Sequence, residues 1–228
     1  MQALRIGDLV GVRYDIQTAT DDFELYDLIQ DPKQRHNLAT DPQYAGWQQK
    51  LKDTVLRVRR PDPSAARPYD AAPLPAVATR STEPGLRWQR FPGAFPWVPR
   101  LPEHLADARG VTSQVGPEVA GPTSAPSVTA FDGFLAVPVE GDYLFTLRAD
   151  AGAVLRLHDA TLFDCDQGYK AGVAKTAEAR LQAGLHPIRI THRSDGIAPC
   201  SSCGGAGPGF QCSPCHRQPF AIDRPSER

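Results

Sequence analysis

Gly141-Asp142-Tyr143-Leu144-Phe145-Thr146-Leu147-Arg148 predicts a β-strand that buries one of its faces. Tyr143, Phe145 and Leu147 are two residues apart, so they share one face of an extended chain, while Leu144, Thr146 and Arg148 share the other. Glu140, Gly141 and Asp142 form a turn signal after Pro138, which marks where the strand begins.

The same alternation continues on both sides of this strand. Leu155 and Leu157 repeat it, and Ile188 and Ile190 alternate with Arg189 and Thr191. Gly, Asp and Pro separate these short runs, and the chain holds 22 prolines and 19 glycines. This pattern favours many turns over a helical bundle. Residues 85–199 are therefore predicted to form an antiparallel β-sandwich or barrel.

Residues 85–199 also resemble a PA14 domain. The motifs that carry the resemblance are Phe134-Leu135-Ala136-Val137-Pro138, Gly141 to Leu147, Ala149-Asp150-Ala151-Gly152-Ala153, Leu155-Arg156-Leu157-His158-Asp159, and Leu181 to Ile190. The resemblance implies an antiparallel β-sandwich that serves as an accessory module.

The resemblance also bears on ligand binding. PA14 domains that bind sugars use two consecutive aspartates to hold Ca²⁺, which accepts oxygen ligands. This chain has Asp150-Ala151 instead, so a Ca²⁺-dependent sugar site is not expected. A polar ligand pocket lined by Asp150, Asp159 and Asp164, with Asp166 nearby, is the remaining expectation.

Other side chains of this region are expected to be structural. His158, His186 and His192 lie on predicted strands without metal-ligand spacing. Cys165 is expected to be a buried thiol. An aromatic group among prolines is expected to pack in the core, with a carbohydrate platform as the alternative; it comprises Trp88, Phe91, Phe95 and Trp97.

Residues 1–60 predict a small antiparallel sheet with one helix. The predicted strands are 3–6, 9–14 and 23–28, with Gly7-Asp8 as a hairpin turn between the first two. Asp41 before Pro42 marks a helix start. The helix is expected to end near Arg59, and its apolar stripe comprises Tyr44, Trp47, Leu51, Val55 and Val58.

This segment resembles the C-terminal subdomain of bacterial sulfatases. The resemblance rests on Ala3-Leu4-Arg5-Ile6-Gly7-Asp8, Glu24-Leu25-Tyr26-Asp27-Leu28, Asp31-Pro32 and Asn37-Leu38-Ala39. It implies a preceding catalytic domain, missing here, that uses formylglycine and Ca²⁺ to hydrolyse a sulfate ester, on a carbohydrate or sulfated polysaccharide. It further implies an exported parent protein, periplasmic or extracellular.

The catalytic motif of that family is Cys/Ser-x-Pro-x-Arg, and the chain does not contain it. Cys212-Ser213-Pro214-Cys215-His216 comes near, but His216 stands where arginine is required. We therefore expect the chain to be inactive on its own, with no catalytic residue. The alternative hypothesis is a stand-alone carbohydrate-binding or adhesion module.

Two further segments complete the chain. Residues 61–84 are rich in Pro and Ala and predict an extended linker, or a strap anchored by Tyr69, Leu74 and Val77. Residues 200–228 form a cysteine-rich tail in which two Cys-x-x-Cys pairs predict a Zn²⁺ site; its ligands would be Cys200, Cys203, Cys212 and Cys215.

Alternatives for these cysteines are disulfides, free thiols, or haem attachment at Cys212-x-x-Cys215-His216. The net charge of −1 gives no general attraction to nucleic acid, and no apolar run is long enough to span a membrane.

Overall fold

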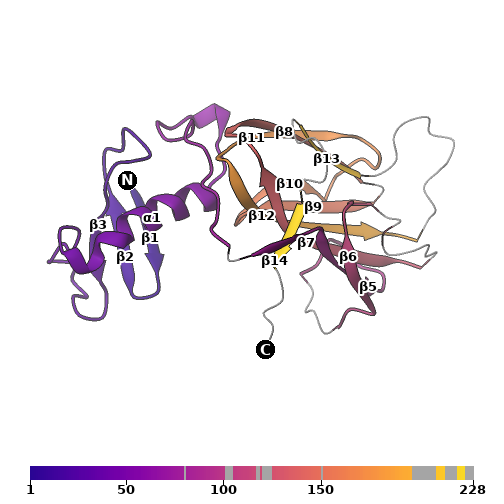
Figure 1. The fold of residues 1–228 in the computed structure, drawn as a ribbon, viewed down its shortest axis with the longest axis horizontal. Helices are drawn as coiled ribbons and strands as arrows, with labels where there is room; N and C mark the ends of the chain where they lie inside the picture. Colours follow the sequence, from indigo (N-terminus) through magenta and orange to yellow (C-terminus); the bar gives the residue numbers. More distant parts are fainter. Residues whose placement is uncertain are drawn as a thin grey trace. The chain divides into compact units, whose positions relative to one another are not determined.

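A computed structural model describes residues 1–79, 81–100, 105–116, 119, 125–149, 151–196, 209–213 and 220–223. The chain forms two compact units, Met1–Pro75 and Ala76–Arg228. Figure 1 shows a long helix in the first unit and the strands of the second unit. The units divide inside the segment 61–84 that the sequence marks as a linker.

The first unit is built on a three-stranded antiparallel sheet. Its order is β1 (Gln2–Ile6), β2 (Leu9–Arg13) and β3 (Glu24–Asp27), and all pairs are antiparallel. Gly7 has a φ of +62° in the β1–β2 turn, a conformation that glycine adopts without strain. The predicted three-stranded sheet and hairpin are confirmed.

One helix packs on this sheet. Asp41 accepts a hydrogen bond from the backbone N–H of Gln43, starting a 3₁₀ turn, Pro42–Tyr44, that leads into α1 (Ala45–Val58). Leu51 and Val55 of α1 join Leu9, Phe23 and Leu25 in the core. The side chain of Val58 is 44% exposed, so its place in the predicted apolar stripe was wrong; the helix ends there.

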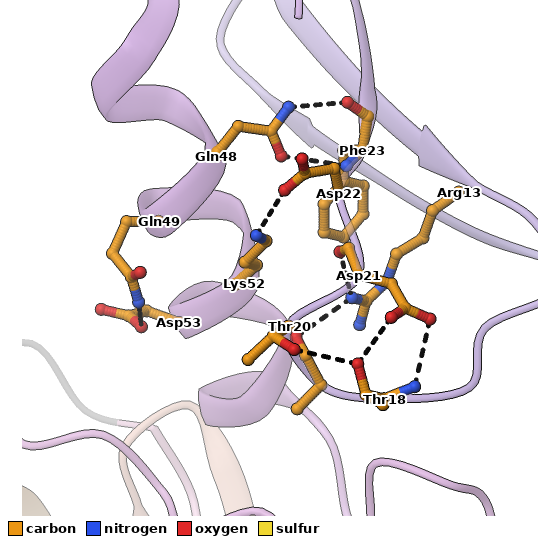
Figure 2. Close-up of polar contacts among 11 residues, drawn as sticks. Arg13, Thr18, Thr20, Asp21, Asp22, Phe23, Gln48, Gln49, Lys52 and Asp53 are labelled. Atoms are coloured by element: carbon orange, nitrogen blue, oxygen red, sulfur yellow. Dashed lines mark hydrogen bonds and ion pairs between the residues drawn. The ribbon is translucent and has the colours of Figure 1, made fainter.

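Polar side chains fix the helix to the start of β3 (Figure 2). The Gln48 amide accepts from the backbone N–H of Phe23 at 2.9 Å and donates to its carbonyl at 2.7 Å, and Lys52 pairs with Asp22 at 2.5 Å. Asn37 accepts from the backbone N–H groups of Leu25 and Ala39, which explains why the Asn-Leu-Ala motif accompanies this strand.

The chain after the helix is strapped to the first unit. Tyr69 is 6% exposed and its ring lies against two guanidinium groups, those of Arg13 and Arg59. Arg59 forms an ion pair with Asp70 and donates to the carbonyl of Tyr69. A short 3₁₀ turn, Pro63–Ala65, precedes this contact. Residues 59–75 therefore belong to the first unit by packing.

The second unit holds two antiparallel sheets. The larger has the path β10-β9-β12-β7-β14-β4, with β5 beside β7 and β6 beside β5, and the smaller has the order β11-β8-β13. In Figure 1 the smaller sheet lies above the larger one. The strands are β4 (Thr82–Pro84), β5 (Leu86–Pro92), β6 (Ala108–Thr112), β7 (Ser127–Val137), β8 (Gly141–Arg148), β9 (Gly152–Leu157), β10 (Ala160–Cys165), β11 (Lys175–Leu181), β12 (Gly184–Ser194), β13 (Gly209–Ser213) and β14 (Phe220–Asp223).

The core of the second unit lies on the faces that the alternation predicts. Buried side chains recur at every second position of the long strands; they include Phe131, Leu135, Tyr143, Phe145, Leu147, Leu155, Leu157, Ile188 and Ile190. The Tyr143 hydroxyl donates to the carbonyl of Val139 at 2.6 Å, which satisfies its one polar atom. The predicted mainly β fold with antiparallel sheets is confirmed.

Two smaller expectations can also be checked. Cys165 is fully buried with a free thiol, and burial raises its pKa, as expected for a structural cysteine. Within the described part of the chain, no helix has both the length and the apolar character needed to cross a membrane.

Candidate ligand pocket

A pocket of about 240 Å³ lies on the outer face of the larger sheet, opposite the core. Five strands contribute to it: β5, β7, β9, β10 and β12. Its polar lining comprises Gln89, Arg100, Asp132, Arg156, Thr161, Asp164, Asp166, Arg189 and Thr191. Its apolar lining comprises Phe91, Val98, Pro99, Val128, Ala130 and Val154.

Strand register brings these residues together from distant parts of the chain. Arg189 of β12 lies directly between Arg156 of β9 and Asp132 of β7. One step along, Thr191 lies between Val154 and Ala130, and Gln89 of β5 lies beyond Ala130. The pocket floor is thus two rows of cross-strand neighbours on one pleated face.

Charge is distributed unevenly over this face. Arg189 forms an ion pair with Asp132. Arg156 is half-buried and has no hydrogen-bond or ion-pair partner among the residues that the structure describes. Like charges directly opposite each other destabilise a strand pair. Arg156 and Arg189 are such a pair, so they lower the stability of the pairing between β9 and β12.

A β-bulge in β10 determines which of its side chains face the pocket. The register of β10 against β9 shifts between Thr161 and Phe163. Thr161 and Asp164 are three residues apart and would face opposite sides of a regular strand. Because the bulge inserts one residue, both line the pocket while Phe163 stays in the core.

One wall of the pocket is a loop held by a carboxylate. Asp166 accepts a hydrogen bond from the backbone N–H of Val98 at 2.7 Å. This contact places Val98, Pro99 and Arg100 along the pocket rim. The loop begins where the N–H of Gly93 donates to the carbonyl of Pro126 at 2.9 Å, which ties it to the start of β7.

The sequence predicted a pocket lined by Asp150, Asp159 and Asp164, and the structure does not bring Asp159 and Asp164 together. Asp164 lines the pocket with Asp166. Asp159 lies in the turn between β9 and β10 and is exposed. Asp150 lies outside the described residues. The structure therefore brings Asp164 together with Asp132, Arg156 and Arg189, and not with Asp159.

The predicted zinc ligands cannot be compared in the same way. Cys200, Cys203 and Cys215 lie outside the described residues, and Cys212 lies in β13, where only the backbone is described. Within the described residues, no cluster of three or more His, Cys, Asp or Glu side chains is arranged to hold a metal ion.

Two histidines of the second unit, His158 and His186, are hydrogen-bonded to each other. His186 is fully buried, and its Nε2 lies 2.9 Å from the carbonyl oxygen of Gln182, which can only accept. Nε2 therefore carries the proton, and Nδ1 accepts from Nε2 of His158 at 2.8 Å. His158 was expected on a strand but lies in the β9–β10 turn, with a φ of +52°.

Members of the predicted aromatic group lie in different environments. Phe91 is buried and lines the pocket. The ring of Trp88 lies where a side chain on Gly110 of β6 would be, 2.8 Å from an added Cβ. Trp97 is 58% exposed and directly precedes the rim residue Val98.

Residues 109–197 match the family model of the PA14 domain. They form a PA14 domain. The domain resemblance carried by the motifs between Phe134 and Ile190 is thereby confirmed, and the pocket lies largely on strands of this domain. The sulfatase resemblance of residues 1–60 stays a prediction.

Several solved structures are similar to the chain at low sequence identity. The PA14 domain of the antifreeze protein MpAFP has 15% identity and a TM-score of 0.40, covering 64% of this chain and 91% of its own. The epithelial adhesin 9 A domain from Candida glabrata, in complex with Galβ1-3GlcNAc, has 11% identity and a TM-score of 0.39, covering 53% and 80%.

A β-glucosidase from Kluyveromyces marxianus, in complex with glucose, has 17% identity and a TM-score of 0.41. It is matched over 56% of this chain, which spans only 15% of the β-glucosidase. A search of curated protein sequences found no match.

Of the residues that the sequence assigned to a polar pocket, Asp164 lines this one, and none of the residues from β5, β7, β9 and β12 was assigned to a pocket from the sequence. The outward positions of Arg189 and Thr191 were visible in the alternation of β12. What the sequence does not encode locally is that Gln89, Ala130, Val154 and Thr191 become neighbours, because this needs the register of four strands. The β10 bulge also breaks the period that would have assigned Asp164 to a face.

Proposed function

We propose that the PA14 domain is a non-catalytic carbohydrate-binding module and that the pocket on its outer sheet face is the binding site. The observation that carries the proposal is the make-up of the lining. Val154, Ala130 and Pro99 offer apolar surface, while Gln89, Thr191 and Asp164 surround it with hydrogen-bonding groups.

A sugar ring has the complementary chemistry. Its C–H faces pack on apolar side chains, and its hydroxyl groups both donate and accept hydrogen bonds, so they need amide, hydroxyl and carboxylate partners around an apolar floor. The volume of about 240 Å³ lies below the range typical of drug-sized ligands, ~300–1,000 Å³, and suits one sugar ring at a time.

Glycan binding by the full chain tests this proposal. A glycan array identifies a ligand, and titration calorimetry measures its affinity. Thr191→Trp places a large ring across the middle of the pocket and is expected to abolish binding. Thr176→Trp makes the same change on an exposed position of β11, in the other sheet, and is expected to have no effect.

The outcomes separate clearly. Loss of binding in Thr191→Trp alone supports the pocket as the site. Equal binding by both variants would move the site elsewhere on the domain, and no binding to any glycan would end the proposal.

A second proposal concerns the first unit. We propose that residues 1–60 are the C-terminal subdomain of a sulfatase-family protein. Support comes from the sequence motifs and from the roles of Asn37, Gln48 and Leu25 in fixing a helix against a short sheet. The core of this unit is small, as expected for part of a larger body.

Two observations test the sulfatase origin. The DNA upstream of Met1 is expected to encode Cys/Ser-x-Pro-x-Arg in the same reading frame. The chain itself is expected to show no hydrolysis of an aryl sulfate above background; turnover by the purified chain would contradict the non-catalytic role.

A further inference from the structure

We infer that the ligand of the pocket is a sugar that carries an anionic group, a sulfate or a carboxylate, and that Arg156 binds this group. The inference rests on the proposed function, because it names the chemical class of sugar for the same site. Its basis is the position and the unmet charge of Arg156.

The backbone of Arg156 is fixed within the sheet, but its guanidinium group has no ion-pair partner among the described side chains there. It lies on β9, between Thr161 of β10 and Arg189 of β12. Arg189 is committed to Asp132 on its far side, so the ion pair leaves Arg156 next to a second guanidinium. Arg156 forms no ion pair with any residue that the structure describes.

The other carboxylates at the pocket do not fill this role. Asp166 accepts from the backbone N–H of Val98 and holds the rim loop. Asp164 is exposed and accepts from the backbone N–H of Asp166 at 3.2 Å. Asp164 lies opposite Val154, two residues along β9 from Arg156, which is ~7 Å of strand.

This separation gives the pocket a donor end and an acceptor end. The guanidinium of Arg156 offers up to five N–H donors in a fork that matches two oxygens of a sulfate or carboxylate. Asp164, at the other end, accepts from ligand hydroxyl groups. Val154, directly opposite Asp164, supplies apolar surface at the same end. A neutral sugar would leave the charge of Arg156 uncompensated, whereas a sugar with one acidic substituent satisfies both ends.

The inference is tested by binding of the full chain to matched sugars. An array presents each sugar in neutral, sulfated and uronic-acid form, and affinities of the best set are measured by calorimetry. The acidic forms are expected to bind at least about tenfold more tightly than the neutral one, since a charge-assisted bidentate pair is among the strong polar contacts. Which acidic form binds more tightly distinguishes sulfate from carboxylate.

Arg156→Gln is expected to remove this preference, so that the acidic and neutral forms bind the variant with similar affinity. Arg180→Gln removes the same charge from β11, where Arg180 pairs with Glu140, and is expected to leave the preference intact. The preference should also weaken as salt is raised. Unchanged thermal midpoints of both variants would show that they fold.

Failure of this inference and failure of the proposed function give different results. If the neutral form binds as tightly as the acidic forms, or if Arg156→Gln keeps the preference, the anionic class is wrong and the sugar site stands. If no form of any sugar binds, both are wrong.

Discussion

At the scale of single residues, the motif Leu181-Gln182-Ala183-Gly184-Leu185-His186 shows how a short stretch carries one turn of the second unit. Leu181 and His186 are fully buried, and the carbonyl of Gln182 binds His186. Gly184 has a φ of +132°, and a Cβ placed there would lie 2.6 Å from Cβ of Ala76. Only glycine allows both the conformation and this close approach.

Gly184→Ala is therefore expected to lower the free energy of unfolding by about 1–3 kcal/mol. Gly141→Ala is the matched control, because no atom lies within 4 Å of an added Cβ there and φ is not positive. Urea denaturation measures both. A destabilisation of equal size in the two variants would contradict the geometry of Gly184.

Asp21 predicts a pH dependence of the first unit. Hydrogen bonds from the Thr18 hydroxyl and from the backbone N–H groups of Gln17 and Thr18 lower the pKa of Asp21 from 3.8 to about 2 (Figure 2). Since the folded pKa is the lower one, the stabilisation is fully present above pH 3.8 and is lost as the pH falls through 2.

The variant Asp21→Asn removes this dependence. Its stability deficit relative to the parent chain is expected to be constant above pH 4 and to shrink between about pH 4 and pH 2. Thermal midpoints over that range measure it. A deficit that grows toward low pH would reverse the sign and contradict the assignment.

At the scale of elements, the strap that follows α1 stabilises the first unit more than its proline-rich sequence indicates. Tyr69 fills the space between Arg13 and Arg59, and Arg59 is anchored by Asp70. Arg13 itself is 2% exposed and donates to the carbonyls of Ala19 and Asp21, so the strap covers a buried cation.

Tyr69→Ala is expected to destabilise the first unit by about 3 kcal/mol, because it removes a buried ring and uncovers Arg13. Tyr14→Ala, at a side chain that is 56% exposed, is expected to change little. Urea denaturation followed by the indole N–H resonance of Trp47 measures the first unit, since Trp88 and Trp97 belong to the second. A neutral Tyr69→Ala would show that the strap is not part of its stability.

The cysteine tail gives a separate prediction for an element known from its sequence alone. Cys200, Cys203, Cys212 and Cys215 are expected to bind one Zn²⁺ per chain. Elemental analysis after purification without chelators measures the metal, and less than ~0.3 zinc per chain would end the zinc assignment. Intact mass before and after alkylation then distinguishes disulfides from free thiols.

At the scale of the whole molecule, the sequence predicted the features that depend on the alternation of neighbouring residues. It did not predict the features that depend on which strands pair and in which register. The alternation in β8 and β12 identified the core face of the second unit, and Asp41 with Pro42 identified the start of the helix. Both signals reside in neighbouring residues.

The pocket depends instead on strands that are distant in the chain. Gln89, Asp132, Arg156 and Arg189 meet only through register, and the bulge in β10 reverses the face of Asp164 relative to a regular strand. The sequence offered a strap anchored by Tyr69 only as an alternative to a linker, because burial of the Tyr69 ring depends on the distant side chain of Arg13.

The most direct test of the central claim locates a bound sugar on the second unit. Amide resonances of the full chain are followed while the best glycan from the array is added. We predict that the largest shifts fall on Ala130, Val154 and Thr191, whose strands form the pocket floor. Shifts confined to β8, β11 and β13, or to the turn at Asp159, would contradict the claim that this outer face is where the protein binds carbohydrate.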